Sequence, residues 1–130
     1  MLKLHNLTRV YQTQDVETSA LNNVNIEIAQ GEFVAIMGPS GCGKSTLLNT
    51  IGMLDSPSSG DYIFDGENVA TYSEKQLSVI RKRSIGFIFQ NFNLIDELTV
   101  AENIELALIY HKIPATERKM KVEQVMDKVG

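Results

Sequence analysis

Apolar and polar residues alternate along the first part of the chain. The alternation runs through residues 2–11, with one phase slip, and resumes at Leu21, Val24, Ile26 and Ile28. Alternation with a period of two is typical of strands that bury one face. The stretch between the two runs, residues 12–19, is mostly polar. We therefore expect two strands of a partly exposed sheet, joined by a loop or hairpin connection.

Two continuous apolar runs interrupt this alternation. They cover residues 33–37 and residues 85–89. Such runs are typical of parallel strands that are buried on both faces. Residues 62–64 form a third, shorter run, which is followed by Asp65-Gly66, a strong hairpin-turn signal. The pattern predicts two buried strands and one short strand that ends in a tight turn.

Helical periodicity appears in four segments. Residues 47–51 indicate a first helix, and Ser73 with Gln76 predicts a capping box that opens a second. Residues 99–110 fit a third helix, and Thr116 is placed to cap a fourth. The apolar residues of the fourth helix fall at i, i+3, i+4 and i+7, at Val122, Val125, Met126 and Val129.

A glycine-rich loop joins the first buried run to the first helix. Residues 38–46 contain the complete pattern G-x-x-x-x-G-K-[ST] in the order strand, loop, helix that this motif requires. Its glycines allow successive N–H groups to turn inward, and the helix start adds a positive dipole end. The loop is predicted to cradle the phosphates of a nucleoside triphosphate through Gly38, Pro39, Ser40, Gly41, Cys42, Gly43, Lys44, Ser45 and Thr46.

Two side chains of this loop carry the expected chemistry. Lys44 is placed as a mobile positive charge for the β- and γ-phosphates, which makes it a candidate catalytic residue. The hydroxyl of Ser45 is placed to coordinate Mg²⁺ between the same phosphates. The alternative is a glycine-rich turn that binds no ligand.

Composition limits the class of protein. The 12 basic and 16 acidic residues leave a net charge of −4, which argues against a nucleic-acid partner. The single cysteine, Cys42, excludes a disulfide within the chain. No apolar segment is long enough to be a signal peptide or a membrane span. We expect a cytoplasmic chain whose contact with a membrane goes through a partner.

Two stretches resemble the nucleotide-binding subunit of ABC transporters. They are GPSGCGKSTLLNTIGMLDSPSSG, residues 38–60, and SIGFIFQNFNLIDELTVAENI, residues 84–104. Within the family, the chain is most similar to the branch that powers lipoprotein release and macrolide or peptide export. The resemblance implies the N-terminal part of an α/β P-loop NTPase (ABC ATPase), with an antiparallel β subdomain, a phosphate-loop strand and helix, and the start of a helical subdomain. Residues 1–130 would form one partial ATP-binding domain, with the core and β subdomain at about 1–90 and the start of the helical subdomain at about 91–130.

The resemblance also assigns ligands and roles. It implies ATP and Mg²⁺ as cofactors, with Tyr11 stacking on the adenine ring. Gln90 would reach both Mg²⁺ and the attacking water, as a metal ligand and catalytic residue. Residues 91–98 would form part of a groove for a coupling helix of an integral membrane permease. Without the resemblance, Tyr11 reads equally well as a packing residue at a strand end, and Gln90 as a solvated loop residue.

The family pattern continues beyond what this sequence contains. The signature segment, the acidic strand with its catalytic glutamate, and the switch histidine do not occur in residues 1–130. We expect the chain to bind Mg-ATP but not to hydrolyse it efficiently, because a water-orienting base contributes about 10²–10⁴-fold. The two buried strands would lack neighbours, which predicts either a fragment of a larger subunit or chains that lend strands to each other. The full-length form would pair with a second copy and attach to the inner face of the cell membrane through the permease.

Two alternative functions remain open at this stage. One is a standalone regulatory module that binds a nucleotide and never hydrolyses it. The other is a different phosphate-loop enzyme such as a GTPase, although no Asn-Lys-x-Asp segment for reading guanine occurs in the sequence.

Overall fold

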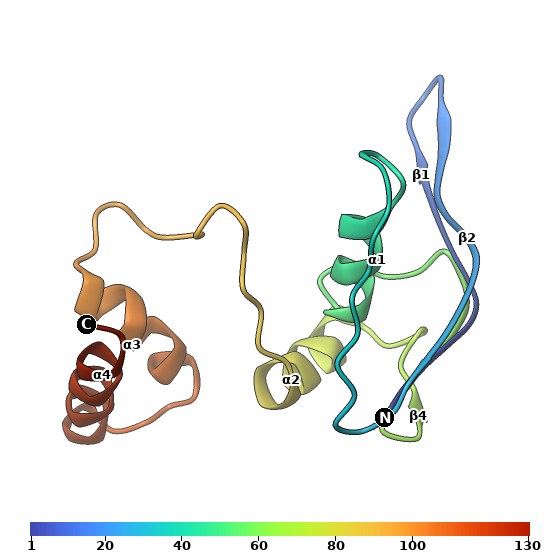
Figure 1. Ribbon diagram of the computed structural model, residues 1–130. Coiled ribbons are helices and arrows are strands. Elements are labelled where there is room, and N and C mark those ends of the chain that lie inside the picture. Colours follow the sequence, from blue (N-terminus) through green and yellow to red (C-terminus); the bar gives the residue numbers. More distant parts are fainter. The chain divides into compact units, whose positions relative to one another are not determined.

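A computed structural model describes all 130 residues. The chain divides into two compact units, Met1–Gly86 and Phe87–Gly130. Figure 1 shows the strands and the first two helices in the first unit and the last two helices in the second.

An antiparallel sheet is the framework of the first unit. Its strands are β1 (Leu2–Gln12), β2 (Glu17–Ile28), β3 (Ser59–Phe64) and β4 (Glu67–Asn68), in the spatial order β2-β1-β3-β4. The two long strands predicted from the alternation pair with each other as a hairpin, and β3 pairs with the other edge of β1 (Figure 1). Asp65 and Gly66 have φ angles of 48° and 90°, so the predicted tight turn after β3 is confirmed.

The phase slip in β1 is a bulge at Asn6. This residue has a φ of 48°, and the pairing register with β2 shifts between Leu4 and Leu7. The side-chain oxygen of Asn25 accepts a hydrogen bond of 2.9 Å from the Asn6 N–H group. The extra residue restores the phase of the strand, so that Leu4 and Leu7 are both buried.

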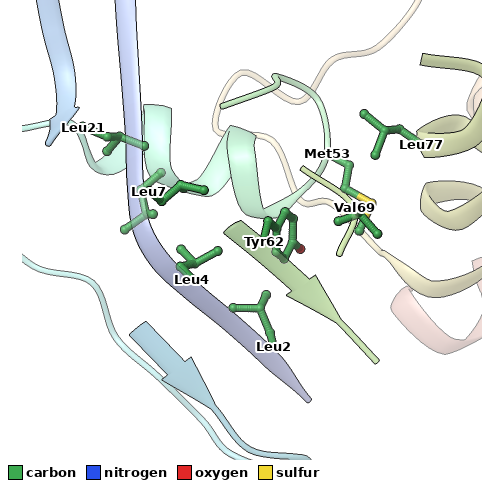
Figure 2. Packing of buried hydrophobic residues seen from close by; sticks show 9 residues of the cluster. Leu2, Leu4, Leu7, Leu21, Met53, Tyr62, Val69 and Leu77 are labelled. Carbon is green, nitrogen blue, oxygen red and sulfur yellow. The ribbon is translucent and has the colours of Figure 1, made fainter. Parts of the chain in front are cut away.

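The core of the first unit lies where the sheet meets α1 (Lys44–Ile51) and α2 (Glu74–Ser84). Figure 2 shows side chains from the strands, the turn after α1, and α2 converging there. Tyr62 is 2% exposed, and its hydroxyl donates a 2.7 Å hydrogen bond to the carbonyl of Ile51, which ties β3 to the end of α1. The cluster comprises Leu2, Leu4, Leu7, Leu21, Leu47, Met53, Tyr62, Val69 and Leu77.

Helix α2 begins at the predicted capping box. The side chain of Gln76 accepts a 3.0 Å hydrogen bond from the N–H of Ser73, which immediately precedes the helix. In its last turn, the Arg81 guanidinium donates to the carbonyl of Met53 and pairs with Glu74 at 2.6 Å. These contacts fix α2 against the turn that follows α1.

The two runs predicted to be buried strands are not strands. Residues 33–37 and 85–89 have no strand pairing, and Phe33 and Ile88 are 96% and 98% exposed. An extended segment becomes a buried strand only when neighbouring strands and a covering layer accept it. The four strands of the sheet pair with one another, and none pairs with either run. The predicted phosphate-loop strand is therefore an unpaired segment in this chain.

Two helices are the regular secondary structure of the second unit. They are α3 (Val100–Tyr110) and α4 (Ala115–Val129), and Arg118 of α4 binds Glu105 of α3 at 2.6 Å. The predicted start of α3 at Thr99 is confirmed by a capping box with Glu102. The prediction that Thr116 caps α4 is wrong. Pro114 is the N-cap, and its fixed φ lets the helix begin one residue before Thr116.

Candidate functional site

The loop of residues 38–46 is shaped by glycines at its turns. Gly41 and Gly43 have φ angles of 79° and 91°, in the region that other residues rarely adopt. A Cβ atom on Gly43 would also collide with the carbonyl oxygen of Ala20 on β2. Only glycine allows the loop to approach the hairpin this closely. The first turn of α1 is thereby held against β2.

The N-terminus of α1 has no side-chain cap. Gly43 is its N-cap residue, and no side chain accepts a hydrogen bond from the first turn. In α3, by contrast, the hydroxyl of Thr99 accepts from the Glu102 N–H at 3.3 Å, and Glu102 accepts from the Thr99 N–H at 2.8 Å. The first N–H groups of a helix need an acceptor. Those of α1 are left for an acceptor from outside the helix, and an anion suits them best.

Lys44 lies across the loop. Its ammonium group donates hydrogen bonds of 2.9 Å to the carbonyl of Gly38 and 2.6 Å to that of Pro39. It also lies 3.6 Å from the sulfur of Cys42. These contacts hold a positive charge against the loop, at the end of α1 that attracts anions. In this structure Lys44 therefore contacts backbone carbonyls of the loop, and its predicted contact with phosphates stays a prediction.

The donor chemistry of the loop fits a magnesium-bound polyphosphate. Ser45 is exposed on the first turn of α1, next to the uncapped N–H groups. Mg²⁺ is held in such sites by one or two oxygen ligands together with phosphate oxygens. In phosphate-loop proteins a loop Ser or Thr hydroxyl acts together with an Asp from another segment, so Ser45 would supply one of the ligands. Pro39, Ser40, Gly41 and Cys42 are exposed, whereas Thr46 is partly buried.

Tyr11 lies near the tip of the same hairpin. It pairs with Thr18, two positions before Ala20, the residue of β2 that contacts the loop. Since strand residues are about 3.3 Å apart, this places Tyr11 about 7 Å along the hairpin from that contact. Its hydroxyl donates a 2.7 Å hydrogen bond to Asp55, and the guanidinium of Arg9 lies 4.6 Å from the ring centroid.

Sequence reasoning did not identify Arg9 or Asp55. Arg9 could have been noticed, because residues i and i+2 of a strand share a face and Arg9 precedes Tyr11 by two positions. Asp55 is 44 residues away from Tyr11, and no local pattern connects them. Only the folding of the segment after α1 onto the end of β1 brings these side chains together.

Gln90 and residues 91–98 belong to the second unit. Gln90 is exposed, and its predicted roles toward Mg²⁺ and water stay predictions. Asn103 organises the segment before α3. Its side-chain amide accepts from the Ile95 N–H at 2.9 Å and donates to the carbonyls of Ile95, Leu98 and Thr99, each at 3.1 Å. This residue, too, was missed, because its partners are set by the loop conformation.

An apolar pocket lies beside this segment. Leu94, Ile95, Leu98, Val100 and Ile104 line it, together with Asp96 and Asn103. It falls on the segment that was predicted to meet a membrane permease. None of the four helices has both the length and the apolar character needed to cross a bilayer.

Comparison with known proteins identifies the family of the chain. The family profile described as ABC transporter matches residues 21–130. The YknY protein of Bacillus subtilis (strain 168), named an uncharacterized ABC transporter ATP-binding protein, is 45% identical over 130 residues, which is 100% of this chain and 56% of that protein. The macrolide export ATP-binding/permease protein MacB of Brucella abortus (strain 2308) is 40% identical over 127 residues, 98% of this chain and 20% of that protein.

A solved structure shares the fold. The ATP-binding cassette MJ0796, in a dimeric post-hydrolysis state bound to ADP and Pi, superposes with a TM-score of 0.88 at 45% identity, covering 95% of this chain and 55% of that one. The chain thus spans about half the length of the ATP-binding proteins and cassettes that it matches. Its fold is that of the N-terminal part of an ABC ATPase. The family profile covers residues 21–130, which include the phosphate loop and all four helices. The chain therefore belongs to the ABC transporter family.

Proposed function

We propose that this chain is the ATP-binding portion of an ABC transporter subunit, and that residues 38–46 hold Mg-ATP. The observation that carries the proposal is the N-terminus of α1, which has no side-chain cap and begins with Lys44. A helix end without a side-chain cap and a lysine held against the same loop together support a site for phosphate. The 45% identical cassette bound to ADP and Pi supports this ligand class.

Within this proposal, each predicted residue has one task. The backbone from Gly38 to Gly43 binds phosphate oxygens, and Lys44 exchanges the carbonyls of Gly38 and Pro39 for the β- and γ-phosphates. Ser45 supplies the hydroxyl ligand of Mg²⁺. Tyr11 stacks on the base, and Gln90 acts on Mg²⁺ and the attacking water.

Hydrolysis by the 130-residue chain alone is slow in this proposal. Phosphoryl transfer to water needs a positioned base in addition to charge stabilisation. No acidic side chain forms an ion pair or hydrogen bond with residues 38–46. The chain also spans only 56% of the length of the YknY protein. Binding is therefore expected to be much stronger than turnover.

The partner of the subunit is a membrane permease in this proposal. The pocket lined by Leu94, Leu98 and Ile104 would receive an apolar element of that permease. MacB is named an ATP-binding/permease protein for macrolide export, which supports a permease partner and transport in the export direction. A second copy of the subunit would complete the assembly, as in the dimeric MJ0796 cassette. The subunit would lie on the cytoplasmic face of the membrane.

Calorimetric titration with Mg-ATP tests the proposal, together with a turnover assay on the same sample. We expect saturable binding that Lys44→Met weakens and Lys3→Met leaves unchanged, with turnover near background. Lys3 is a suitable control because it pairs with Glu27 on the hairpin, outside the loop. Absence of Mg-ATP binding by the wild-type chain would refute the proposal. The C-terminal half of the MJ0796 cassette is then added in trans. Restored ATP turnover supports the transporter subunit, whereas turnover that stays at background favours a standalone regulatory module.

A further inference from the structure

Asp55 binds two residues of β1 at once. Its Oδ2 atom accepts hydrogen bonds of 2.7 Å from the Tyr11 hydroxyl and 3.0 Å from Arg9 Nε, and its Oδ1 atom lies 2.7 Å from Arg9 Nη2. The carboxylate thus holds the guanidinium through both oxygens, a geometry that fixes orientation as well as distance. Arg9 and Asp55 are only 23% and 22% exposed, so water weakens this pair less than the ion pairs at the surface.

Asp55 is also attached to the helix that starts at the phosphate loop. The N–H groups of Leu54 and Asp55 donate to the carbonyl of Asn49 in α1, at 2.8 and 3.3 Å. The turn between them and the helix is fixed as well, because Met53 is 1% exposed with a φ of 56°. Helix α1 starts at Lys44 in the phosphate loop, and Asp55, in the segment after its C-terminal end, hydrogen-bonds to Tyr11. The helix thus links the phosphate loop to Tyr11.

Arg9 covers one face of the Tyr11 ring and leaves the other face open for stacking. Its guanidinium lies 4.6 Å from the ring centroid, in the range of a cation–π contact. A planar ring has two faces, and this contact covers one of them. Tyr11 is nevertheless 40% exposed, which leaves surface for a second planar group. A base that stacks on Tyr11 is thereby restricted to one side.

We infer that Arg9 and Asp55 are positioning residues of the nucleotide site, which hold the Tyr11 ring at a fixed distance and angle from the phosphate loop. This inference rests on the proposed binding of ATP. The pair touches the ring rather than the nucleotide. Its effect is to orient the ring before the ligand arrives, which reduces the entropy lost when base and phosphates bind together. Triphosphate without a base gains nothing from this arrangement.

The test compares ATP with inorganic triphosphate, both with Mg²⁺, by calorimetric titration of the 130-residue chain. We expect Asp55→Ala to weaken ATP binding by about five- to tenfold, at the lower end of the range that loss of one stacked base produces. Inorganic triphosphate should bind within about twofold of the wild-type affinity. Tyr11→Phe, which keeps the ring and removes its hydroxyl, should produce a smaller loss for ATP alone.

A double-mutant cycle separates positioning from a general structural role. In a Tyr11→Leu background there is no ring to orient, so Asp55→Ala should have no further effect on ATP binding. Glu105→Gln is the matched control, because Glu105 forms a similarly exposed arginine pair with Arg118 in the second unit. Asp55→Asn, which keeps the shape of the side chain, replaces Asp55→Ala if circular dichroism shows that the latter is unfolded.

The outcomes are distinct. Equal losses for ATP and triphosphate, or an undiminished effect of Asp55→Ala in the Tyr11→Leu background, would overturn the inference while leaving the proposed function intact. So would an Asp55 variant that binds ATP as tightly as the wild type. A wild-type chain that bound neither ligand would refute the proposed function itself, and with it the positioning role.

Discussion

The ammonium group of Lys44 donates a 2.6 Å hydrogen bond to the carbonyl oxygen of Pro39, on the opposite side of the glycine-rich loop. A second bond, of 2.9 Å, reaches the carbonyl of Gly38. The lysine thereby stabilises the glycine-rich loop. Under the proposed function, lysine and loop bind phosphate together. When phosphate oxygens replace the two carbonyls, a neutral acceptor is exchanged for a charged one, and the hydrogen bonds become stronger.

Replacing Lys44 by methionine is expected to weaken Mg-ATP binding by about 10- to 100-fold. Hydrogen bonds to charged groups are worth about 1.5–3 kcal/mol, and 1.4 kcal/mol corresponds to a factor of ten. Calorimetric titration measures the change. Lys44→Arg should recover little of the loss, because the larger guanidinium does not fit between the same two carbonyls. Wild-type affinity in Lys44→Met would contradict the assigned role.

Gly43→Ala is expected to destabilise the chain by about 3 kcal/mol or more. The substitution forces a side chain into a positive φ, at about 1–2 kcal/mol, and drives a Cβ atom into the carbonyl oxygen of Ala20. Gly66→Ala is the matched control. Gly66 has nearly the same φ, and a Cβ there meets no atom within 4 Å. Urea unfolding should therefore give a smaller loss for Gly66→Ala, and equal losses would show that the close approach to β2 is unimportant.

Alkylation of Cys42 should block nucleotide binding, and Mg-ATP should protect the thiol. The side chain is exposed, and its sulfur lies 3.6 Å from the Lys44 ammonium, so an added group occupies the concave side of the loop. Mass spectrometry of the maleimide adduct, with and without Mg-ATP, measures the labelling rate. The proposed ligand position predicts slower labelling with Mg-ATP. Identical rates would place the nucleotide elsewhere.

The stability of α3 should fall in acid through Glu102. Hydrogen bonds from the side chain and then the backbone of Thr99 lower the pKa of this carboxyl below its ordinary value. A lowered pKa in the folded state means that the contribution is complete above the ordinary pKa of about 4.3 and is lost as the pH falls through the lower folded-state value. Circular dichroism at 222 nm should show an acid loss of helix that is smaller in Glu102→Gln. Identical acid transitions in the wild type and in Glu102→Gln would contradict the role of the Glu102 carboxylate.

The exposed apolar runs have a consequence for association. Phe33, Met37 and Ile88 are 96%, 88% and 98% exposed, in segments that the sequence predicts to be strands. Unpaired extended segments with apolar side chains invite pairing with another chain. Light scattering of the 130-residue chain is expected to detect self-association that Phe33→Ser and Ile88→Ser reduce. A monomer at all concentrations would contradict it.

Local patterns were sufficient wherever a structure depends on neighbours along the chain. The strands β1 and β2, the Asp65-Gly66 turn, the capping box at Ser73 and the helix that starts after Thr99 are confirmed, because each is stabilised by residues close in sequence. The glycine-rich loop turns at glycines with positive φ, as the motif predicts, whereas its binding role stays a prediction. Thr116 was wrongly predicted as a cap because Pro114 starts the same helix earlier.

Burial and long-range contacts could not be predicted from local sequence patterns. The apolar runs of residues 33–37 and 85–89 have the composition of buried strands, but burial requires neighbouring strands, which the sheet of this chain does not provide. The sequence by itself determined the phosphate-binding motif, the family resemblance and the local elements. Only the tertiary structure decided that Asp55 joins Arg9 and Tyr11, because these contacts depend on where folding places residues that no local pattern connects.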